Sequence, residues 1–238
     1  MIPAYNEERT LPWVLAGVRK RLPGARILVV SDGSTDGTVG AARERGAGVL
    51  ELSRRGYGEA VRAGFEEARR LGPDWLLQLD ADGQHDPESL PGILGALQGR
   101  PGVDHEPRTK NHERVFRPDI VIGSRFLHPR SYRPALPRRL GMGFFAWLAS
   151  RLTGLSITDP TSGMRGFSGK AVLHFAGDPR HSAYHDADVL VRAHKAGLRI
   201  LEVPAMMREA PEGRSMHKGF GILLYAFRML WATLRAAV

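Results

Sequence analysis

Residues 26–82 read RILVVSDGSTDGTVGAARERGAGVLELSRRGYGEAVRAGFEEARRLGPDWLLQLDAD. In this stretch short apolar runs alternate with longer segments whose apolar side chains recur at helical spacing. The alternation is a βαβαβ pattern, which predicts an α/β fold in which helices cover a mainly parallel central sheet. Ligands of such sheets bind beyond the carboxyl ends of the strands, so a site is expected in the segments that follow the apolar runs.

Two acidic turns follow apolar runs of this stretch: SDGSTDGT at residues 31–38 and DADGQHD at residues 80–86. Because both lie at the carboxyl ends of predicted parallel strands, we expect them to face one crevice. Asp and Gly also favour ordinary turns, and turn and helix-cap chemistry alone would explain Ser34, Thr35 and Asp36. Asp32 directly follows a buried strand, where its carboxylate can accept hydrogen bonds from a base or a ribose.

The second acidic turn carries the pattern of a cation site. Asp80 and Asp82 are separated by one residue, so in an extended chain they point the same way, and the turn brings Gln84 and His85 near them. Hard oxygen ligands suit Mg²⁺ or Mn²⁺, which binds through one or two carboxylates and completes its shell with phosphates and water. This position at the end of a strand favours a metal-bound diphosphate over a simple surface turn.

Composition narrows the classes of protein. A chain of 238 residues, 42% of them hydrophobic, predicts one substantial domain. The absence of cysteine excludes disulfides and thiolate-bound zinc and suits a reducing cytosol. A net charge of +9 favours anionic partners. Nucleic acid is disfavoured among them, because the arginines are dispersed, no aromatic stripe is interleaved with them, and no recognition motif is present.

The remainder of the chain offers further elements. The sequence predicts a helix over residues 87–97, an exposed polar loop over 100–119 and a buried strand in IVIGSRF at 120–126. Residues 136–155 form an amphipathic pattern in which arginines stand beside Phe, Trp and Leu, and we leave open whether it packs into the core or lies on a bilayer. The C-terminus is a second amphipathic candidate. The N-terminus lacks the pattern of a signal peptide, and no segment is a clean transmembrane helix.

Five motifs occur together in this chain in a recognisable order: IPAYNEE, SDGSTDGT, LDADGQHDP, VIGSRF and DPTSGMRGF. In order and spacing they resemble the family 2 glycosyltransferases, most of all the polyprenyl-phosphate sugar synthases of the dolichol-phosphate-mannose synthase type. The resemblance runs from Ile2 to about Ser215. It implies a single GT-A domain over residues 1–215, with a nucleotide-sugar site, followed by an amphipathic and membrane-associated helix over 216–238.

The resemblance also implies roles for individual residues. The nucleoside and diphosphate sugar would be held by Pro3, Ala4, Tyr5, Glu7, Asp32, Asp80, Ala81, Arg208 and Ser215. Asp82 and Gln84 would coordinate Mg²⁺ or Mn²⁺. In the loop that closes over the diphosphate, Met216 stands where the family usually has lysine, and Arg214 or Lys218 would have to compensate. The family's first strand also has more residues before the PAYNE segment than this chain has.

Catalysis depends on the acceptor. A hydroxyl acceptor needs a general base, and Asp186 and Asp188 fall where the family places an acidic residue, although acids at a helix start are also favoured by the helix dipole. A phosphate acceptor is already anionic and needs positive charge instead. By resemblance Arg125 would supply it, with Arg138 or Arg139 as a second cation. Asp159, Ser162 and Arg165 match the motif that follows, and a structural turn explains them as well.

The sequence therefore predicts a metal-dependent, inverting glycosyltransferase that moves a hexose from a nucleotide diphosphate sugar to a polyprenyl phosphate. We expect it to be cytoplasmic and peripheral at the inner face of the plasma membrane, with homo-oligomerisation left open. The alternative keeps the enzyme but gives it a soluble hydroxyl or glycan acceptor and an aspartate base.

Overall fold

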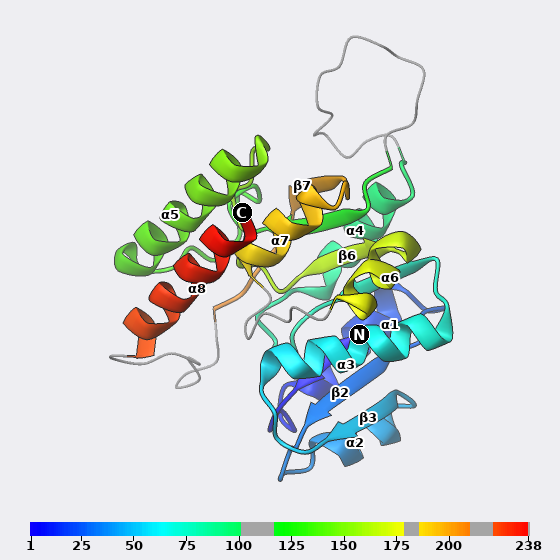
Figure 1. Cartoon of the computed structure of the whole chain (residues 1–238). Helices are drawn as coiled ribbons and strands as arrows, with labels where there is room; N and C mark the ends of the chain where they lie inside the picture. Colours follow the sequence, from blue (N-terminus) through cyan, green and yellow to red (C-terminus); the bar gives the residue numbers. More distant parts are fainter. Residues whose placement is uncertain (101–116, 179–185, 210–220, 238) are drawn as a thin grey trace.

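The computed structural model describes residues 1–100, 117–178, 186–209 and 221–237 (Figure 1). Its strands are β1 (Ile2–Ala4), β2 (Leu28–Asp32), β3 (Gly48–Leu52), β4 (Trp75–Gln78), β5 (Ile120–Ser124), β6 (Arg165–Ser168) and β7 (Ile200–Pro204). Its α-helices are α1 (Leu11–Arg21), α2 (Thr38–Glu44), α3 (Tyr57–Leu71), α4 (Leu90–Leu97), α5 (Leu136–Thr153), α6 (Gly169–Gly177), α7 (Ala187–Lys195) and α8 (Gly221–Ala237). A short 3₁₀ turn, η1 (Pro87–Ser89), precedes α4.

The strands form two sheets that meet edge to edge. The first has the order β1-β2-β3, with every pair parallel. The second has the order β4-β6-β5-β7, in which β6 is antiparallel to both neighbours and β5 is parallel to β7. The sheets join where β1 lies beside β4: the amino group of Met1 donates to the Leu77 carbonyl (2.8 Å), and the Leu79 N–H donates to the Met1 carbonyl (3.4 Å). Met1 thus forms hydrogen bonds with both Leu77 and Leu79, the residues two apart on the neighbouring segment, which is the pattern of parallel strands.

The predicted α/β architecture is therefore confirmed, with one addition. The three apolar runs of residues 26–82 are β2, β3 and β4, and the runs alternate with α2 and α3 as expected. The addition is the antiparallel strand β6, which lies between β4 and β5. Its four residues, Arg165–Ser168, are too short to show a period of their own, and they arrive from a distant part of the sequence.

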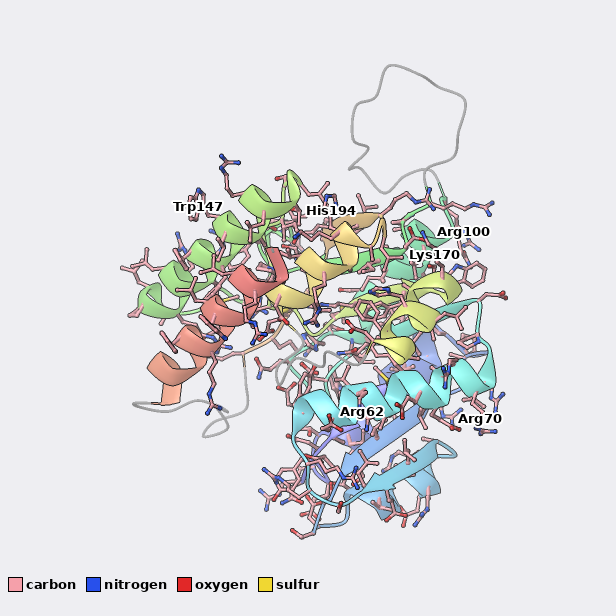
Figure 2. The ribbon with its side chains drawn as sticks, viewed as in Figure 1. Arg62, Arg70, Arg100, Trp147, Lys170 and His194 are labelled. Atoms are coloured by element: carbon pink, nitrogen blue, oxygen red, sulfur yellow. The ribbon has the colours of Figure 1, made fainter. Side chains whose placement is uncertain are left out.

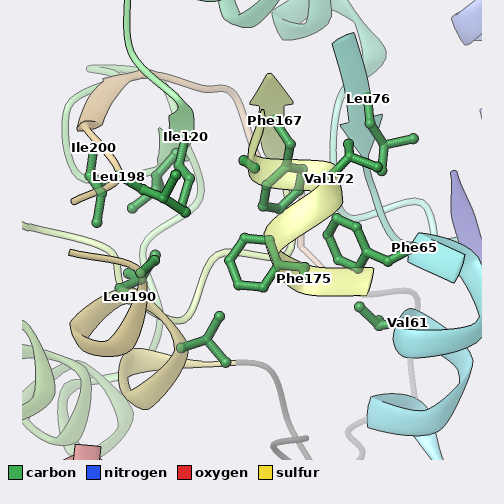
Figure 3. Close-up of a cluster of buried hydrophobic side chains, with 14 of the residues drawn as sticks. Val61, Phe65, Leu76, Ile120, Phe167, Val172, Phe175, Leu190, Leu198 and Ile200 are labelled. Carbon is green, nitrogen blue, oxygen red and sulfur yellow. The ribbon is translucent and has the colours of Figure 1, made fainter. Parts of the chain in front are cut away.

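Helices cover both faces of the sheets (Figure 1). On one face α3 and α6 pack around Phe65, Phe167 and Phe175, whose ring centroids lie 5.0 to 5.5 Å apart (Figure 3). Such aromatic pairs contribute about 0.5–1.5 kcal/mol each beyond the area that they bury. On the other face α1 and α4 bury Leu11, Leu15, Leu90, Ile93 and Leu97 in a second cluster. The strand ends are thus held by a rigid core.

The predicted helix over residues 87–97 is confirmed, and it begins with the η1 turn. The side chain of Asp86 accepts a hydrogen bond from the Glu88 N–H (3.1 Å), and Pro87 takes the first position, where its missing N–H costs nothing. The buried strand expected from IVIGSRF is β5. Most of the expected polar loop over 100–119 lies outside the described residues.

Helices α5, α7 and α8 lie together at one side of the molecule, away from β1–β3 (Figure 1). Phe145 and Leu148 of α5 pack against Met229 of α8 in a small separate cluster. The amphipathic helix expected over 136–155 is α5, and it turns one face inward as a core helix does. Among the described helices, none is both long enough and apolar enough to cross a bilayer. The division of the chain at residue 215 stays a prediction.

Candidate functional site

Hydrogen bonds connect the two turns that are expected to hold the nucleoside, one after β1 and one after β2. Asn6, which has a left-handed backbone (φ 55°), accepts from the Thr35 N–H (2.8 Å) and donates its own N–H to Ser34 Oγ (3.2 Å). The Glu7 N–H donates to Thr38 Oγ1 (2.8 Å). Ser34 and Thr35 therefore connect the turn after β1 with the turn after β2, as ordinary turn chemistry predicts for them.

Among the nucleoside residues, Tyr5 offers a surface to a ligand. Its side chain is 39% exposed, and the Arg54 guanidinium lies over its ring, 3.3 Å from the centroid. Pro3 and Ala4 are buried beneath the turn. Glu7 accepts a hydrogen bond from Thr10 Oγ1 (2.6 Å), which ties it to the approach to α1. The exposed ring beside a guanidinium is suited to stacking on a base.

Asp32, at the end of β2, is fastened to the start of α3. Its carboxylate accepts from the Arg55 N–H (2.7 Å) and the Gly56 N–H (2.9 Å). The next residue is Tyr57, whose hydroxyl donates to Asp80 Oδ1 (3.0 Å) at the end of β4. The two acidic strand ends, which the sequence predicted to face one crevice, are thus joined through residues 55–57.

Asp80 sits in a cradle made by Tyr57 at the start of α3, by Gly163, and by His85 of its own turn. Tyr57 holds Oδ1, and the carboxylate rests directly on Gly163, where a Cβ atom would lie 3.0 Å from Oδ1 and closer still to Oδ2. The Asp80 N–H donates to His85 Nδ1 (3.1 Å). Burial lowers the pKa of His85 to about 4, so the ring is neutral and Nδ1 can accept that hydrogen bond. The His85 ring, whose role the sequence leaves unsettled, is thus hydrogen-bonded to the backbone of this turn.

The surroundings of Asp80 and Asp82 raise the pKa of both carboxyl groups. Burial raises the pKa of Asp80, and the hydrogen bond from Tyr57 and the charges of Arg165 and Arg125 only partly offset that rise. Burial and the negative charge of Asp80 likewise raise the pKa of Asp82. A cation bound beside these two carboxylates would favour the ionised form of both.

The residues expected to hold the metal are brought together. Asp82 Oδ2 accepts from Gln84 Nε2 (2.7 Å), and Oδ1 accepts from the Gln84 N–H (2.9 Å). Within the described residues, no three His, Asp or Glu side chains form a closed metal cage. An open set of one carboxylate and one amide oxygen fits Mg²⁺ or Mn²⁺, which take substrate phosphates and water as their other ligands.

Arg208 is also placed beside this turn. Residues 206–208 run antiparallel to 84–86, since the Arg208 N–H donates to the Gln84 carbonyl (2.7 Å) and the Asp86 N–H donates to the Met206 carbonyl (3.1 Å). The guanidinium forms an ion pair with Asp86 (2.8 Å) and lies 5.0 Å from the ring centroid of Trp13. Ala81, inside the turn, is buried. Ser215, the other residue expected at the diphosphate, lies outside the described residues.

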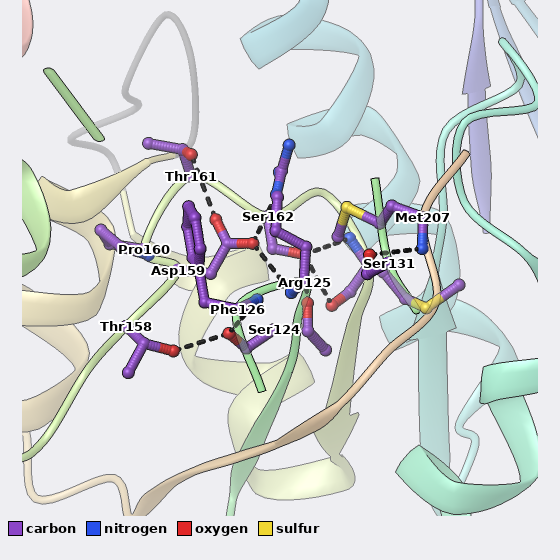
Figure 4. A network of polar contacts seen from close by, with 12 residues as sticks. Ser124, Arg125, Phe126, Ser131, Thr158, Asp159, Pro160, Thr161, Ser162 and Met207 are labelled. Atoms are coloured by element: carbon purple, nitrogen blue, oxygen red, sulfur yellow. Dashed lines mark hydrogen bonds and ion pairs between the residues drawn. The ribbon is translucent and has the colours of Figure 1, made fainter. Parts of the chain in front are cut away.

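Arg125 is the centre of a buried network (Figure 4). It is only 7% exposed, and its Nε donates to Asp159 Oδ2 (2.6 Å), whose carboxylate is fully buried. Glu202 accepts from the Asp159 N–H (2.8 Å) and from Thr158. Burial raises the pKa of Glu202, against the hydrogen bonds that it accepts. Asp159 of the DPTSGMR motif therefore holds the Arg125 side chain in place. The positive charge of Arg125 also partly offsets the rise in the pKa of Asp80.

The remaining candidates are less closely gathered. Arg138 and Arg139 lie exposed in the first turns of α5, outside the Arg125 network. Asp188 is buried and forms an ion pair with Arg192 (3.3 Å), one turn along α7. Asp186 precedes α7 and is also buried, and its charge contributes to raising the pKa of Tyr57. The charge of Asp186 therefore acts on Tyr57, whose hydroxyl donates to Asp80.

Two residues of the cradle were not foreseen from the sequence. Tyr57 stands at the first position of a predicted helix, and only the closeness of α3 to the end of β4 gives its hydroxyl a partner. Gly163 belongs to the DPTSGMRGF motif, and the sequence predicts no role for it. A glycine between Ser and Met in a buried turn is a signal that space is needed, and the structure shows that the space is taken by Asp80.

Gly163 provides a direct test of this cradle. We expect Gly163→Ala to lower kcat by about tenfold, because the added methyl group would push the Asp80 carboxylate out of place. Gly92→Ala in α4 is the matched control, since a Cβ atom there meets nothing within 4 Å. Steady-state kinetics and thermal unfolding of both variants measure the effect, and equal activity in both would show that Asp80 does not need this space.

Comparison with known proteins identifies the chain. The glycosyl transferase family 2 profile matches residues 1–172, which is well over half of the sequence. The chain belongs to glycosyl transferase family 2. This glycosyltransferase is 33% identical to an undecaprenyl-phosphate mannosyltransferase of Micrococcus luteus, over 92% of the chain and 86% of that protein. It is 31% identical to a polyprenol monophosphomannose synthase of Mycolicibacterium smegmatis, over 96% of the chain and 84% of that protein.

Solved structures confirm the fold of the family 2 enzyme. Glucosyl-3-phosphoglycerate synthase of Mycobacterium tuberculosis, in complex with phosphoglyceric acid, superimposes with a TM-score of 0.69 at 21% identity, covering 99% of this chain and 78% of that one. The same protein has been solved with Mn²⁺ and uridine-diphosphate-glucose, at a TM-score of 0.66. The α/β architecture described above is thus the GT-A fold.

Proposed function

We propose that this glycosyltransferase moves a hexose from a nucleotide diphosphate sugar to a polyprenyl phosphate at the inner membrane face, with inversion at the anomeric carbon. The observation that carries the proposal is a set of exposed apolar and basic side chains that begins a few residues after Arg125, in the segment between β5 and α5. The names of the relatives, which carry undecaprenyl-phosphate, polyprenol and dolichyl-phosphate acceptors, support it.

Helices α5 and α8 pack against each other, and we call their exposed side chains, which are of two kinds, the α5–α8 face. Its apolar members are Leu136, Leu140, Phe144 and Trp147 of α5 and Phe227, Trp231 and Leu234 of α8. Its basic members on and before α5 are Arg130, Arg133, Arg138 and Arg139. The apolar side chains of α5 follow helical spacing on the side opposite the packed Phe145 and Ala149, and Figure 2 shows Trp147 projecting outward. Such a face suits the interface of an anionic bilayer.

On the donor side, Tyr5 and Asp32 mark the nucleoside end and Asp80 the sugar end. Asp82 and Gln84 would hold the divalent cation, which when bound offsets the charge that develops on the departing diphosphate. Arg208, fixed by Asp86 beside the turn, adds a second positive group there. Asp80, held by Tyr57 and Gly163, faces the positive charge that develops on the sugar.

On the acceptor side, the phosphate monoester is already anionic, so positioning replaces deprotonation. An oxygen of that phosphate forms the bond to the anomeric carbon as the bond to the diphosphate oxygen breaks and the electron pair leaves with the diphosphate. Attack opposite to the leaving group inverts the configuration. Arg125, preorganised by Asp159, would hold the acceptor phosphate through the nitrogens that Asp159 does not use.

The reaction can be tested directly. Purified protein is incubated with labelled nucleotide sugars, polyprenyl phosphate and Mg²⁺ or Mn²⁺, and the organic phase is counted. We expect labelled lipid with one donor and a requirement for the divalent cation. Transfer to water-soluble hydroxyl compounds, with no label in lipid for any donor, would refute the acceptor.

Membrane association can be tested by flotation. We expect Leu140→Gln combined with Trp147→Gln to weaken binding to vesicles of phosphatidylcholine and phosphatidylglycerol by roughly tenfold to a hundredfold, because both side chains would lose apolar burial. The matched control is Leu173→Gln combined with Trp75→Gln, which removes exposed side chains of the same two types from α6 and β4. Equal loss of binding in both pairs would show that the α5–α8 face is not the membrane surface.

A soluble acceptor is the second candidate. It is favoured by Asp186, which is buried and whose charge acts on Tyr57, because its carboxylate could take the proton of a hydroxyl group. The fold neighbour solved with phosphoglyceric acid is a protein of this kind. Under this second hypothesis the α5–α8 face would have no role in binding the acceptor.

A further inference from the structure

The turn after β4 is supported by a side chain that no motif assigns to the site. Tyr57 opens α3, and its position is set by Gly56, whose φ of 100° is a conformation that side chains rarely adopt, and by the bonds from residues 55 and 56 to Asp32. Its ring therefore leaves the helix start in one direction, toward the end of β4.

The Tyr57 hydroxyl lies between two polar groups of β4 and its extension. Gln78 Nε2 donates to the hydroxyl oxygen (3.1 Å), and the hydroxyl donates to Asp80 Oδ1 (3.0 Å). Gln78 is buried at 1% exposure, and its amide N–H occupies an acceptor site of the hydroxyl oxygen, which leaves the hydroxyl proton for Asp80. Burial and the charge of Asp80 raise the pKa of Tyr57 well above its usual value, so the proton is retained for donation.

We propose that Tyr57 is a positioning residue for donor chemistry, which directs the Asp80 carboxylate toward the sugar through the Gln78–Tyr57–Asp80 hydrogen-bond relay. The proposal rests on the donor half of the proposed function, because it assumes that Asp80 contacts the sugar diphosphate. It does not depend on which acceptor is used. The relay also links the nucleoside end to the sugar end, since Asp32 fixes the segment that carries Tyr57.

The relay holds one oxygen of the Asp80 carboxylate, and neighbouring residues pack against the other. Oδ1 is taken by Tyr57, while Oδ2 lies against Gly163 and 3.6 Å from His85 Nδ1. The Asp80 side chain remains 27% exposed. A carboxylate that is held at both oxygens and still partly exposed is preorganised for an electrostatic contact with the substrate.

The test is Tyr57→Phe, which removes the hydroxyl and keeps the ring. We expect kcat to fall by about tenfold to a hundredfold, as for loss of a hydrogen bond to a charged group, with binding of nucleoside diphosphate unchanged in calorimetry. Tyr132→Phe, in the loop before α5, is the matched control. A purely structural role for Tyr57 would instead weaken nucleoside diphosphate binding and lower the unfolding temperature along with kcat.

A double-mutant cycle with Asp80→Asn makes the result specific. In the Asp80→Asn background we expect Tyr57→Phe to have no further effect, because the group that it positions is gone. Additive losses would overturn the proposal, as would a Tyr57→Phe enzyme with wild-type kcat. The cycle is run on both lipid transfer and donor hydrolysis without acceptor, with GDP-mannose and UDP-glucose as probes. A failed lipid acceptor therefore leaves the donor-hydrolysis cycle to decide the role of Tyr57.

Discussion

Asp82→Asn lowers kcat by about a hundredfold to a thousandfold and raises the divalent cation concentration needed for half-maximal rate, if the second carboxylate of the DAD turn binds the cation. The substitution keeps the shape of the side chain, and an amide oxygen can still accept from the Gln84 N–H. The fold of the turn is therefore preserved while the charge is lost. Initial rates over a Mg²⁺ and Mn²⁺ titration measure both effects.

The control for this change is Asp74→Asn, because Asp74 is an exposed aspartate at the opposite end of β4. It removes one negative charge just before β4 begins, without touching the turn. Asp82→Asn with a rate within about threefold of wild type and an unchanged metal dependence would mean that the two carboxylates serve another purpose. Nucleotide binding without metal, compared in both variants, shows whether the donor site itself has been damaged.

The sequence predicts those parts of this site that depend only on residues close to one another along the chain. The end of a strand is marked by an apolar run, so Asp32 and Asp80 could be placed at one edge of the sheet from periodicity alone. The helix start at Asp86 is similarly local, since Asp, Pro and Glu stand in the positions that a helix N-terminus prefers. Both predictions needed only neighbours along the chain.

The parts that could not be predicted depend on contacts between distant segments. Strand β6 pairs with β4, about ninety residues earlier (Trp75 with Ser168), and nothing within four residues indicates that partner. The cradle has the same character, because Gly163 and Tyr57 reach Asp80 only after β6 and α3 have packed on the sheet. Periodicity gives the direction of a side chain but not the distant group that it meets.

Arg125 also looks different once its partner is known. The sequence predicts only that Arg125 is a cation available to bind a phosphate. In the structure its guanidinium is paired with the fully buried Asp159. Removing it with Arg125→Ala would leave that carboxylate uncompensated, which typically costs about 3–5 kcal/mol of folding free energy. The alanine variant would therefore confuse loss of acceptor binding with loss of fold.

Arg125→Lys is the sharper variant, because it keeps a positive charge beside Asp159 and loses the planar fork that grips a phosphate. With polyprenyl phosphate as acceptor we expect kcat/KM for the acceptor to fall by about a hundredfold, with donor KM unchanged. Asp186→Asn should then cost only about threefold, since a phosphate needs no base. Thermal unfolding of both variants checks that the Arg125 network and the start of α7 are intact.

The same pair of variants decides between the two acceptors. A hydroxyl acceptor must lose its proton, so Asp186→Asn would then lower kcat by roughly a hundredfold to ten-thousandfold, and Arg125→Lys would have little effect on acceptor KM. The ratio of the two losses, measured with one donor, is independent of the absolute activity of the preparation. A large loss for Asp186→Asn with a small one for Arg125→Lys would exclude the polyprenyl phosphate mechanism, because no step of that mechanism transfers a proton to an aspartate.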